Sequence, residues 1–215
     1  MNFSALRNWL PNVQPRLGRE PVRSRATLTR RALGLAAAAL TLTSLAGAGS
    51  VQVPFGVQAD LIAKVASFDR NFAARSGARA LVLVMQMPND AESAAGAMEL
   101  KSALSRVPTV GDRPHEEQIV TYSGVAAFAE MVKIRKPAIV YFGPGFAKEL
   151  SAIRNSSSNS SLLTVGATPD YVEGGIVLGF DLVSGRPKLL INLGQARKQQ
   201  VDFPGSVLRL MKVYP

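Results

Sequence analysis

Few residues in this 215-residue chain have the types and spacing that catalysis requires. His115 is the one histidine, and H-E-E-Q-I from His115 begins like the H-E-x-x-H zinc-protease motif, with Ile119 in place of the second histidine. We therefore interpret His115 as part of a solvated loop and not as a metal ligand. Glu116 and Glu117 are adjacent, so in a strand they would point to opposite faces and could not act as a facing acid–base pair.

Other catalytic motifs are also missing. The chain has no cysteine, which excludes disulfides, thiol catalysis and zinc–thiolate sites. Gly143-Pro144-Gly145 begins like a dinucleotide fingerprint, but Lys148 stands at the third glycine and Pro144 has no backbone N–H. We interpret this segment as a strand-to-helix turn that could still form part of a ligand rim. Acid–base and nucleophilic mechanisms need positioned titratable groups, so the sequence favours a non-enzymatic protein without cofactor or metal.

The chain opens with a basic segment followed by an apolar one. Residues 1–31 carry seven arginines and one acid, whereas Ala32–Ala48 has no charge. The pair Arg30-Arg31 stands directly before the apolar run. A basic region followed by an apolar region is typical of a secretory signal, and the arginine pair is typical of the twin-arginine type.

A small-x-small site ends this leader, at Ala46 and Ala48. We expect residues 1–48 to be a cleaved signal peptide and residues 49–215 to be one domain in the periplasm. Three alternatives are open. A buried helix of the domain would normally have a polar face, which this run lacks. A mitochondrial transit peptide is also arginine-rich, but would not continue into a smooth apolar run. An uncleaved membrane anchor would need about 20 apolar residues, and this run is short and weakly apolar.

Most of the basic excess belongs to the leader. Beyond residue 48 there are 18 basic and 14 acidic side chains, against 25 and 15 in the whole chain. Lys133, Arg135 and Lys136 form the only tight basic cluster, at a predicted helix end where cations complement the helix dipole. The sequence therefore predicts no nucleic-acid partner.

Helix and strand patterns alternate along residues 49–215. The spacing of apolar residues predicts helices at 58–74, 90–107, 125–136 and 146–153, and strands at 80–85, 118–122, 138–142 and 162–165. A β-hairpin is predicted at 175–193 and a closing helix at 207–213, with a polar surface turn at 155–161. We predict an α/β fold: a single domain with a central, mainly parallel sheet flanked by helices, a C-terminal β-hairpin and a closing helix.

Three segments of the C-terminal half carry motifs of a known family. They are L-L-T-V-G-A-T-P-D-Y-V-E-G-G-I-V-L-G-F (162–180), G-R…L-I-N-L…A-R (185–197) and S-V-L-R-L-M-K-V (206–213). These resemble the "LTVsd…GGmI.F", "G-R…f-e-I-N-L…A-r" and "S..LL.LA.V" segments of the YfiR (YfiR/HmsC-like) family. The helix at 57–72 lies where that family has "KAAfLykFakF". Arg70-Asn71 replaces the family's common Trp-Pro pair, and the cysteines found in many members are missing.

The resemblance implies a regulatory role. The best-known members of the YfiR family lie in the periplasm, bind the sensor domain of a membrane-bound diguanylate cyclase and repress it, which lowers cyclic-di-GMP and biofilm formation. The implied partner is the exported domain of an inner-membrane signalling protein. The alternative is a periplasmic small-molecule binding protein that resembles a small solute receptor. A homodimer and a small ligand are left open.

Loops after the parallel strands carry the predicted interaction surface. In an open parallel sheet these loops gather at one edge, where binding groups tend to lie. The candidate residues are Gly143, Gly145, Phe146, Asp170 and Tyr171. Phe146 and Tyr171 would be exposed aromatic anchors beside glycines that permit close approach of another backbone. The alternative is that both rings are core residues under the loops.

Three further residues of the family motifs are expected to be structural. Gly174 and Gly175 should meet a backbone need, either a positive φ or close approach to a neighbour. Asn192 is a polar residue in an apolar strand, so we expect it to form hydrogen bonds within the fold.

Overall fold

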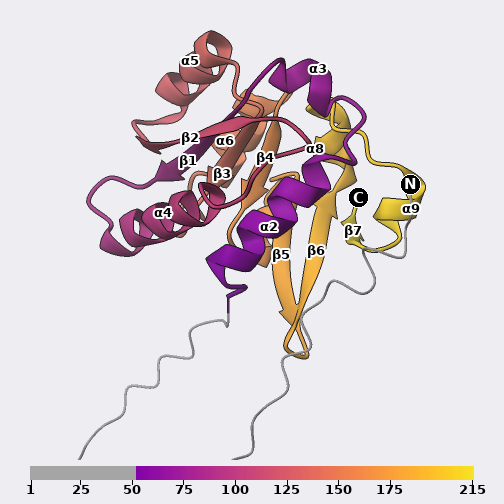
Figure 1. Cartoon of the computed structure of the whole chain (residues 1–215). Coiled ribbons are helices and arrows are strands. Elements are labelled where there is room, and N and C mark those ends of the chain that lie inside the picture. Colours follow the sequence, from indigo (N-terminus) through magenta and orange to yellow (C-terminus); the bar gives the residue numbers. More distant parts are fainter. Residues whose placement is uncertain (1–51) are drawn as a thin grey trace, which may run out of the picture. The chain divides into compact units, whose positions relative to one another are not determined.

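A seven-stranded sheet forms the centre of the molecule in a computed structural model that describes residues 52–215 (Figure 1). The predictions for the export leader, including Arg30, Arg31, Ala46 and Ala48, lie outside the described residues. The strands, in chain order, are β1 (Ala80–Gln86), β2 (His115–Thr121), β3 (Ile139–Phe142), β4 (Leu163–Gly166), β5 (Leu178–Val183), β6 (Arg186–Asn192) and β7 (Lys212–Tyr214).

Helices connect these strands and cover the sheet. They are α2 (Phe55–Ala66), α3 (Phe72–Ser76), α4 (Ala91–Leu104), α5 (Val125–Arg135), α6 (Leu150–Ser157), α7 (Pro169–Glu173), α8 (Leu193–Lys198) and α9 (Gly205–Leu208). Within the described range, none of them has the length and apolar character needed to traverse a lipid bilayer.

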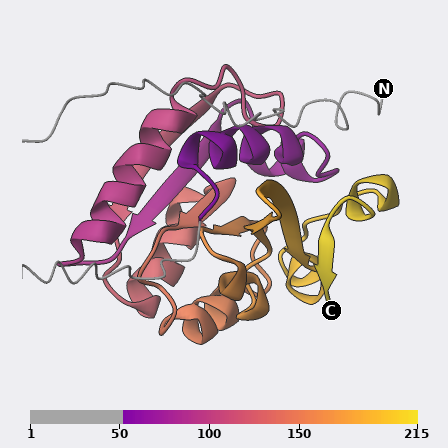
Figure 2. The ribbon, with the colours of Figure 1, turned by 90° about the horizontal axis from the view of Figure 1, so that it is seen from below.

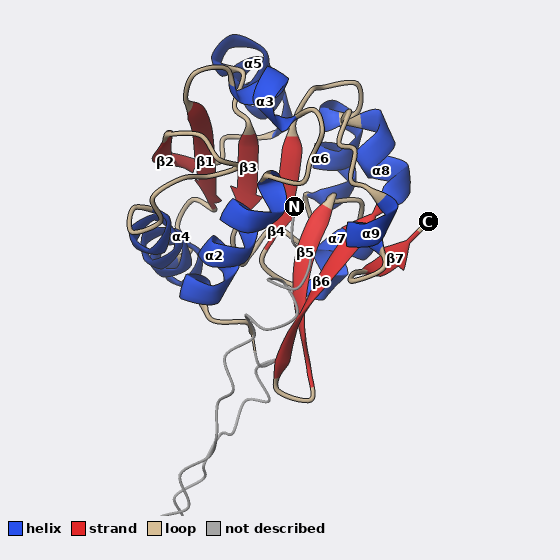
Figure 3. Ribbon diagram, turned by 45° about the vertical axis from the view of Figure 1, so that its right-hand side comes forward, coloured by secondary structure: helices blue, strands red, loops and turns tan. Residues whose placement is uncertain are grey.

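The spatial order of the strands is β2-β1-β3-β4-β5-β6-β7. Strands β1 to β5 pair in parallel, β6 pairs antiparallel with β5, and β7 runs parallel to β6. The predicted α/β fold, with its mainly parallel sheet and a hairpin formed by β5 and β6, is therefore confirmed. The tip of this hairpin extends beyond the rest of the sheet (Figure 3).

The two faces of the sheet bury different residues of the same strands. In β1, Val82 and Val84 pack with α2 and α4, whereas Leu83 and Met85 pack with Phe128 of α5 and with α6. This alternation follows from the two-residue period of a strand. Figure 2 shows the purple and magenta helices α2 and α4 on one side of the strands and orange helices on the other. Because both faces are covered, the central strands read as continuous apolar runs.

The predicted helix at 58–74 is in fact two helices. α2 ends at Ala66 and α3 begins at Phe72. The buried carboxylate of Asp69 accepts hydrogen bonds from the backbone N–H groups of Asn71 and Asp202, at 3.1 and 3.0 Å, and forms an ion pair with Arg75 at 2.6 Å. These contacts fix a turn between α2 and α3 and hold it against the chain near residue 202.

The predicted closing helix at 207–213 is wrong. α9 ends at Leu208, and Lys212–Tyr214 form β7, which pairs with Leu190–Asn192 of β6. Val207 and Met211 are both buried, a spacing that fits a helix as well as this turn-and-strand arrangement. The free edge of β6 offers backbone hydrogen bonds that a helix could not use.

His115 is not in a solvated loop, as the sequence suggested, but begins β2. Its side chain is 7% exposed; Nε2 lies 2.9 Å from the carbonyl oxygen of Val107, and Nδ1 lies 3.1 Å from Oε2 of Glu117. Within the described residues, no group of three or more His, Asp or Glu side chains could hold a metal ion. The contact with Val107 fastens the start of this edge strand to the beginning of the loop that follows α4.

Candidate functional site at the carboxyl edge of the sheet

The strand order reverses beside β1. The chain moves from β1 outward to β2 and then returns to place β3 on the other side of β1. In open α/β sheets, ligands bind at the carboxyl ends of the strands where the order reverses in this way. The loops at this point follow β1 and β3, so Met87–Asp90 and Gly143–Glu149 form the walls of the expected crevice.

These two loops pack directly on each other. Gly145 has a φ of +93°, and a Cβ atom there would lie 2.8 Å from Oδ2 of Asp90 and 3.1 Å from Cγ of Met87. Pro144 lies against Gly96 of α4, where an added Cβ would be 3.3 Å from the proline ring. The glycines bring the loops together and so close the crevice. They do not make room for a ligand or another backbone here.

The side chain of Asp90 belongs to this contact and also caps a helix. It accepts a hydrogen bond from the backbone N–H of Ser93 at 2.9 Å, as expected of an N-cap residue. The Ser93 hydroxyl in turn accepts from the backbone N–H of Met87 at 2.9 Å. The Met87 N–H and the Asp90 carboxylate are thus used within the fold.

Phe146 is fully buried, so its interpretation as an exposed anchor is wrong. Its ring makes edge-to-face contacts with Tyr122 and Phe142, with centroid distances of 5.5 and 5.3 Å. The ring lies in the same buried cluster as Met85 of β1 and Ile153 of α6. Phe146 is a core residue that anchors the loop after β3.

Tyr171 is also buried, with 3% of its surface exposed, and its interpretation as a surface anchor is wrong as well. Its hydroxyl accepts a hydrogen bond from the backbone N–H of Phe146 at 2.8 Å and donates one to the carbonyl oxygen of Gly143 at 3.2 Å. Gly166 makes room for the ring, since a Cβ there would lie 2.7 Å from Cβ of Tyr171. One hydroxyl therefore clamps the loop after β3 to α7.

Burial raises the pKa of the Tyr171 hydroxyl from its ordinary 10.0 to about 12. The hydrogen bond from Phe146 lowers the pKa in part, and the nearby carboxylates of Asp170, Asp90 and Glu92 raise it. These carboxylates form an acidic rim, of which Asp170 and Glu92 are exposed. Gly145 is the other exposed candidate residue, whereas Gly143 is buried.

We expect Tyr171→Phe to lower the free energy of unfolding by about 1–3 kcal/mol at neutral pH, because it leaves the buried N–H of Phe146 without a partner. The pH dependence should change too. A phenol whose folded-state pKa is raised stabilises the fold fully below pH ~10 and loses this contribution as the pH rises towards ~12. Urea unfolding at about pH 9 and about pH 11.5 should therefore show a smaller alkaline loss in the variant. An equal alkaline loss in both proteins would contradict this role.

A second polar pair on this edge was missed by the sequence analysis. The Tyr122 hydroxyl donates to Oε2 of Glu149 at 3.1 Å, and burial together with this bond raises the pKa of Tyr122 to about 12. The hydroxyl of Thr168, just before α7, is buried without a hydrogen-bond partner among the described residues. These groups do not form a nucleophile–base pair; what they add to the edge is packing and acidic charge.

Gly174 and Gly175 meet the expected backbone needs. Gly175 has a φ of +103°, and a Cβ there would lie 2.2 Å from Cδ of Arg154. A Cβ at Gly174 would lie 2.7 Å from Cδ1 of Leu150. Asn192 forms hydrogen bonds within the fold: Nδ2 donates to the carbonyl oxygen of Val172 at 3.1 Å, and Oδ1 accepts from Gln195 N–H at 2.8 Å. The latter bond caps α8.

Gly175→Val should destabilise the protein by at least about 1 kcal/mol, because a β-branched residue is strained at positive φ and would displace the Arg154 side chain. Thermal unfolding followed by circular dichroism measures the loss. Gly185→Val is a useful comparison, since Gly185 also has a positive φ, +73°, but open space around it. If Gly185→Val loses less stability than Gly175→Val, the difference is the cost of the contact with Arg154. If both variants lose the same stability, the backbone conformation alone determines the loss.

Two solved structures share the fold. A conserved domain protein from Vibrio cholerae O1 biovar El Tor strain N16961 is 14% identical, with a TM-score of 0.53 over 77% of this chain. The ABC domain in complex with L-Trp from Streptococcus pneumoniae is 15% identical, with a TM-score of 0.52 over 75%. This chain spans 61% and 60% of the lengths of those two chains. At such identities the likeness shows the fold alone.

Comparison of sequences says more about the family of this chain than the two structures do. No curated protein matches the chain. The model of the family described as YfiR/HmsC-like matches residues 56–212, nearly all of the described part of the chain.

Proposed function

This chain belongs to the YfiR/HmsC-like family, and on that basis we propose that it is a periplasmic regulator without enzymatic activity. In this proposal it binds the exported domain of an inner-membrane signalling protein and represses it. The family match over residues 56–212 is the observation that carries the proposal. The closed crevice between the loops after β1 and β3 agrees with it, because these two loops pack on each other.

The partner that we propose is a membrane-bound diguanylate cyclase. Deletion of the gene from its own host should then raise cyclic-di-GMP and biofilm formation, and expression of residues 1–215 should restore both. Expression of residues 49–215, without the leader, should not restore them, because the protein would remain in the cytoplasm. Unchanged cyclic-di-GMP after deletion would contradict the choice of a cyclase as the partner.

Export is tested separately. We expect N-terminal sequencing of the periplasmic form to begin at Gly49, after Ala48. Arg30→Lys combined with Arg31→Lys should trap a folded precursor inside the cell, since the arginine pair is what the twin-arginine route reads. Normal export of this variant would point to the general secretory route, and an intact leader in membranes would mean that it serves as an anchor.

The alternative function is a small solute receptor. The L-Trp complex among the similar structures makes this class worth testing, although the likeness concerns only the fold. A receptor would bind a small molecule in the absence of any protein partner. A melting-temperature shift of the purified periplasmic form with a panel of amino acids would favour the receptor, and unchanged cyclic-di-GMP in the deletion strain would strengthen that conclusion.

A further inference from the structure

Helix α5 is apolar but hardly buried. Eight of its eleven residues in V-A-A-F-A-E-M-V-K-I-R are apolar, yet Phe128 is the only buried one. By contrast, α2 buries seven of its twelve residues. A helix on the surface of a globular protein normally turns its apolar stripe to the core. Met131 and Val132 pack partly against the core under the helix, so the apolar surface of α5 that has no cover within the described part of this chain belongs to the outer parts of these two side chains, to Ala126 and Ala127, and above all to Ile134.

The most exposed large apolar side chain in the described residues lies on this helix. Ile134 is 69% exposed, in the last turn of α5. Met131 and Val132, in the turn before it, are half-buried. An exposed isoleucine alone would need no explanation, but one that adjoins partly exposed apolar neighbours is typical of an interaction site.

Two pockets flank α5. One has a volume of about 250 Å³ and lies between the helix and the end of β2, with Met85, Val120, Phe128 and Met131 among its lining residues. The other, of about 430 Å³, lies between the helix, α3 and residues 160–161, and its lining includes Val132 and Lys133. Both are large enough to receive side chains from a partner that lies across the helix.

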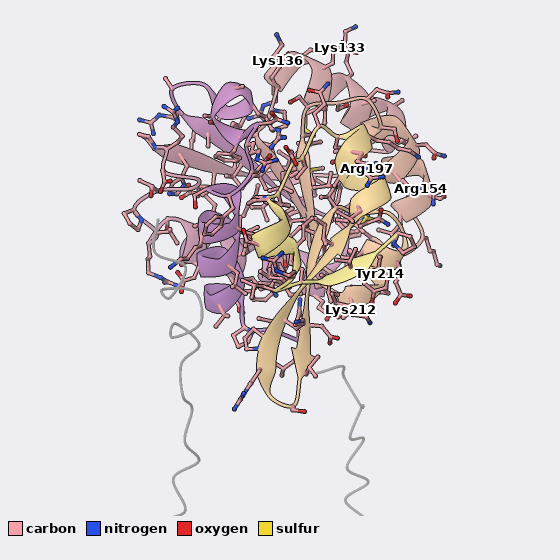
Figure 4. The ribbon with its side chains drawn as sticks, turned by 90° about the vertical axis from the view of Figure 1, so that its right-hand side faces the viewer. Lys133, Lys136, Arg154, Arg197, Lys212 and Tyr214 are labelled. Atoms are coloured by element: carbon pink, nitrogen blue, oxygen red, sulfur yellow. The ribbon has the colours of Figure 1, made fainter. Side chains whose placement is uncertain are left out.

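The same end of α5 is strongly basic. Lys133 and Lys136 are exposed and form no ion pair within the described part of the chain, and Figure 4 shows both at one end of the molecule. Arg135 donates to the side chain of Gln118. A helix C-terminus carries only about half a negative charge, so three cations exceed what the dipole needs. The excess positive charge would attract an acidic surface.

We propose that the α5 surface, formed by Met131, Val132, Lys133, Ile134 and Lys136 with the two flanking pockets, is the docking site for the signalling partner. The proposal rests on the proposed function and adds to it the kind of surface that binds. The partner presents an acidic segment that also carries apolar side chains. Its carboxylates meet Lys133 and Lys136, and its apolar side chains cover Ile134 and enter the pockets.

Site-specific photo-crosslinking of the full chain in its own host tests this. Ile134→p-benzoylphenylalanine places the probe on the α5 surface, and Met98→p-benzoylphenylalanine on α4 is a matched control, because Met98 is 65% exposed. Mass spectrometry of the adducts should identify an inner-membrane signalling protein at position 134, joined through an acidic segment of its exported domain, and no such adduct at position 98.

The outcomes separate the docking surface from the proposed function. An adduct with the signalling protein at position 98 and not at 134 would overturn the α5 surface but leave the regulator in place. An adduct at 134 with a second copy of this chain, or with lipid alone, would also overturn it. If neither these positions nor the exposed Val183 and Val213 yields a signalling protein, the proposed function itself fails.

A charge-reversal experiment then tests the recognition chemistry with the exported domain identified by crosslinking. Lys133→Glu combined with Lys136→Glu should weaken binding at least about tenfold and reduce its dependence on salt. Lys101→Glu combined with Lys148→Glu makes the same charge change at other exposed lysines and should alter the Kd less than about twofold. Equal weakening by both pairs would mean that net charge, and not the α5 surface, governs binding. Melting temperatures of all variants should match.

Discussion

Asp69→Asn lowers the free energy of unfolding by about 3–5 kcal/mol, the largest loss we expect from one polar substitution. Asp69 and Arg75 form an ion pair at 2.6 Å, with side chains 0% and 1% exposed. The substitution keeps the shape of the side chain but leaves a guanidinium charge buried without its counter-charge. Arg75 would keep its hydrogen bond to the carbonyl oxygen of Gln200, which carries no charge to balance the guanidinium. Urea unfolding followed by far-ultraviolet circular dichroism measures the effect.

The control for this prediction lies beside it in the fold. Asp202 forms an ion pair with Arg70 at 3.0 Å, but these side chains are 50% and 63% exposed. Asp202→Asn should therefore cost no more than about 1 kcal/mol. Asp69→Asn combined with Arg75→Met should recover part of the loss, since it removes the unpaired charge. Similar small losses at Asp69 and Asp202 would show that the buried pair is not needed to hold the turn.

The central sheet could be predicted because its strands leave a simple signal. Ala80–Gln86 and Ile139–Phe142 are buried on both faces, so each reads as a short unbroken apolar run. Ser184 and Gly185 both adopt positive φ in the turn between β5 and β6, and the sequence S-G between two apolar runs predicted that hairpin. In both cases the deciding information is local.

The errors arise where contacts distant in sequence decide the structure. The turn at Asp69 depends on Arg75 and on the backbone near residue 202, and the apolar period of residues 58–74 continues across it. Likewise, β7 forms because β6 has a free edge, which the sequence of residues 207–213 does not reveal. An apolar helical period is therefore not sufficient for a helix when another segment offers hydrogen bonds.

The sequence also predicted only part of the candidate site. The sequence located the loops at the carboxyl edge, but the same glycines are compatible with an open rim and with loops that touch each other. At Gly145, which lies against Asp90, the loops touch each other. The α5 surface was missed for a related reason: apolar spacing predicts a helix but does not say whether a neighbour covers it. The signal that was available is the number of apolar residues in 125–135, together with the basic cluster at its end.

Phe146→Ala should lower the free energy of unfolding by about 3–5 kcal/mol. The side chain is fully buried, and its removal would leave a cavity and end the edge-to-face contacts with Tyr122 and Phe142. The Tyr171 hydroxyl would still bind the backbone at residue 146, so the loop would not simply collapse into the space. Thermal and urea unfolding of the periplasmic form measure the loss.

Phe55→Ala is the matched control, because Phe55 is a half-buried phenylalanine in the first turn of α2 and its removal should cost clearly less. The comparison also tests the assignment of Phe146 as a core residue. If it is a core residue, repression of the partner falls only in proportion to the lost folded fraction, and growth at lower temperature restores both together. If Phe146→Ala keeps its melting temperature but loses repression, the ring reaches the partner, and the carboxyl edge, not α5, would be the docking surface.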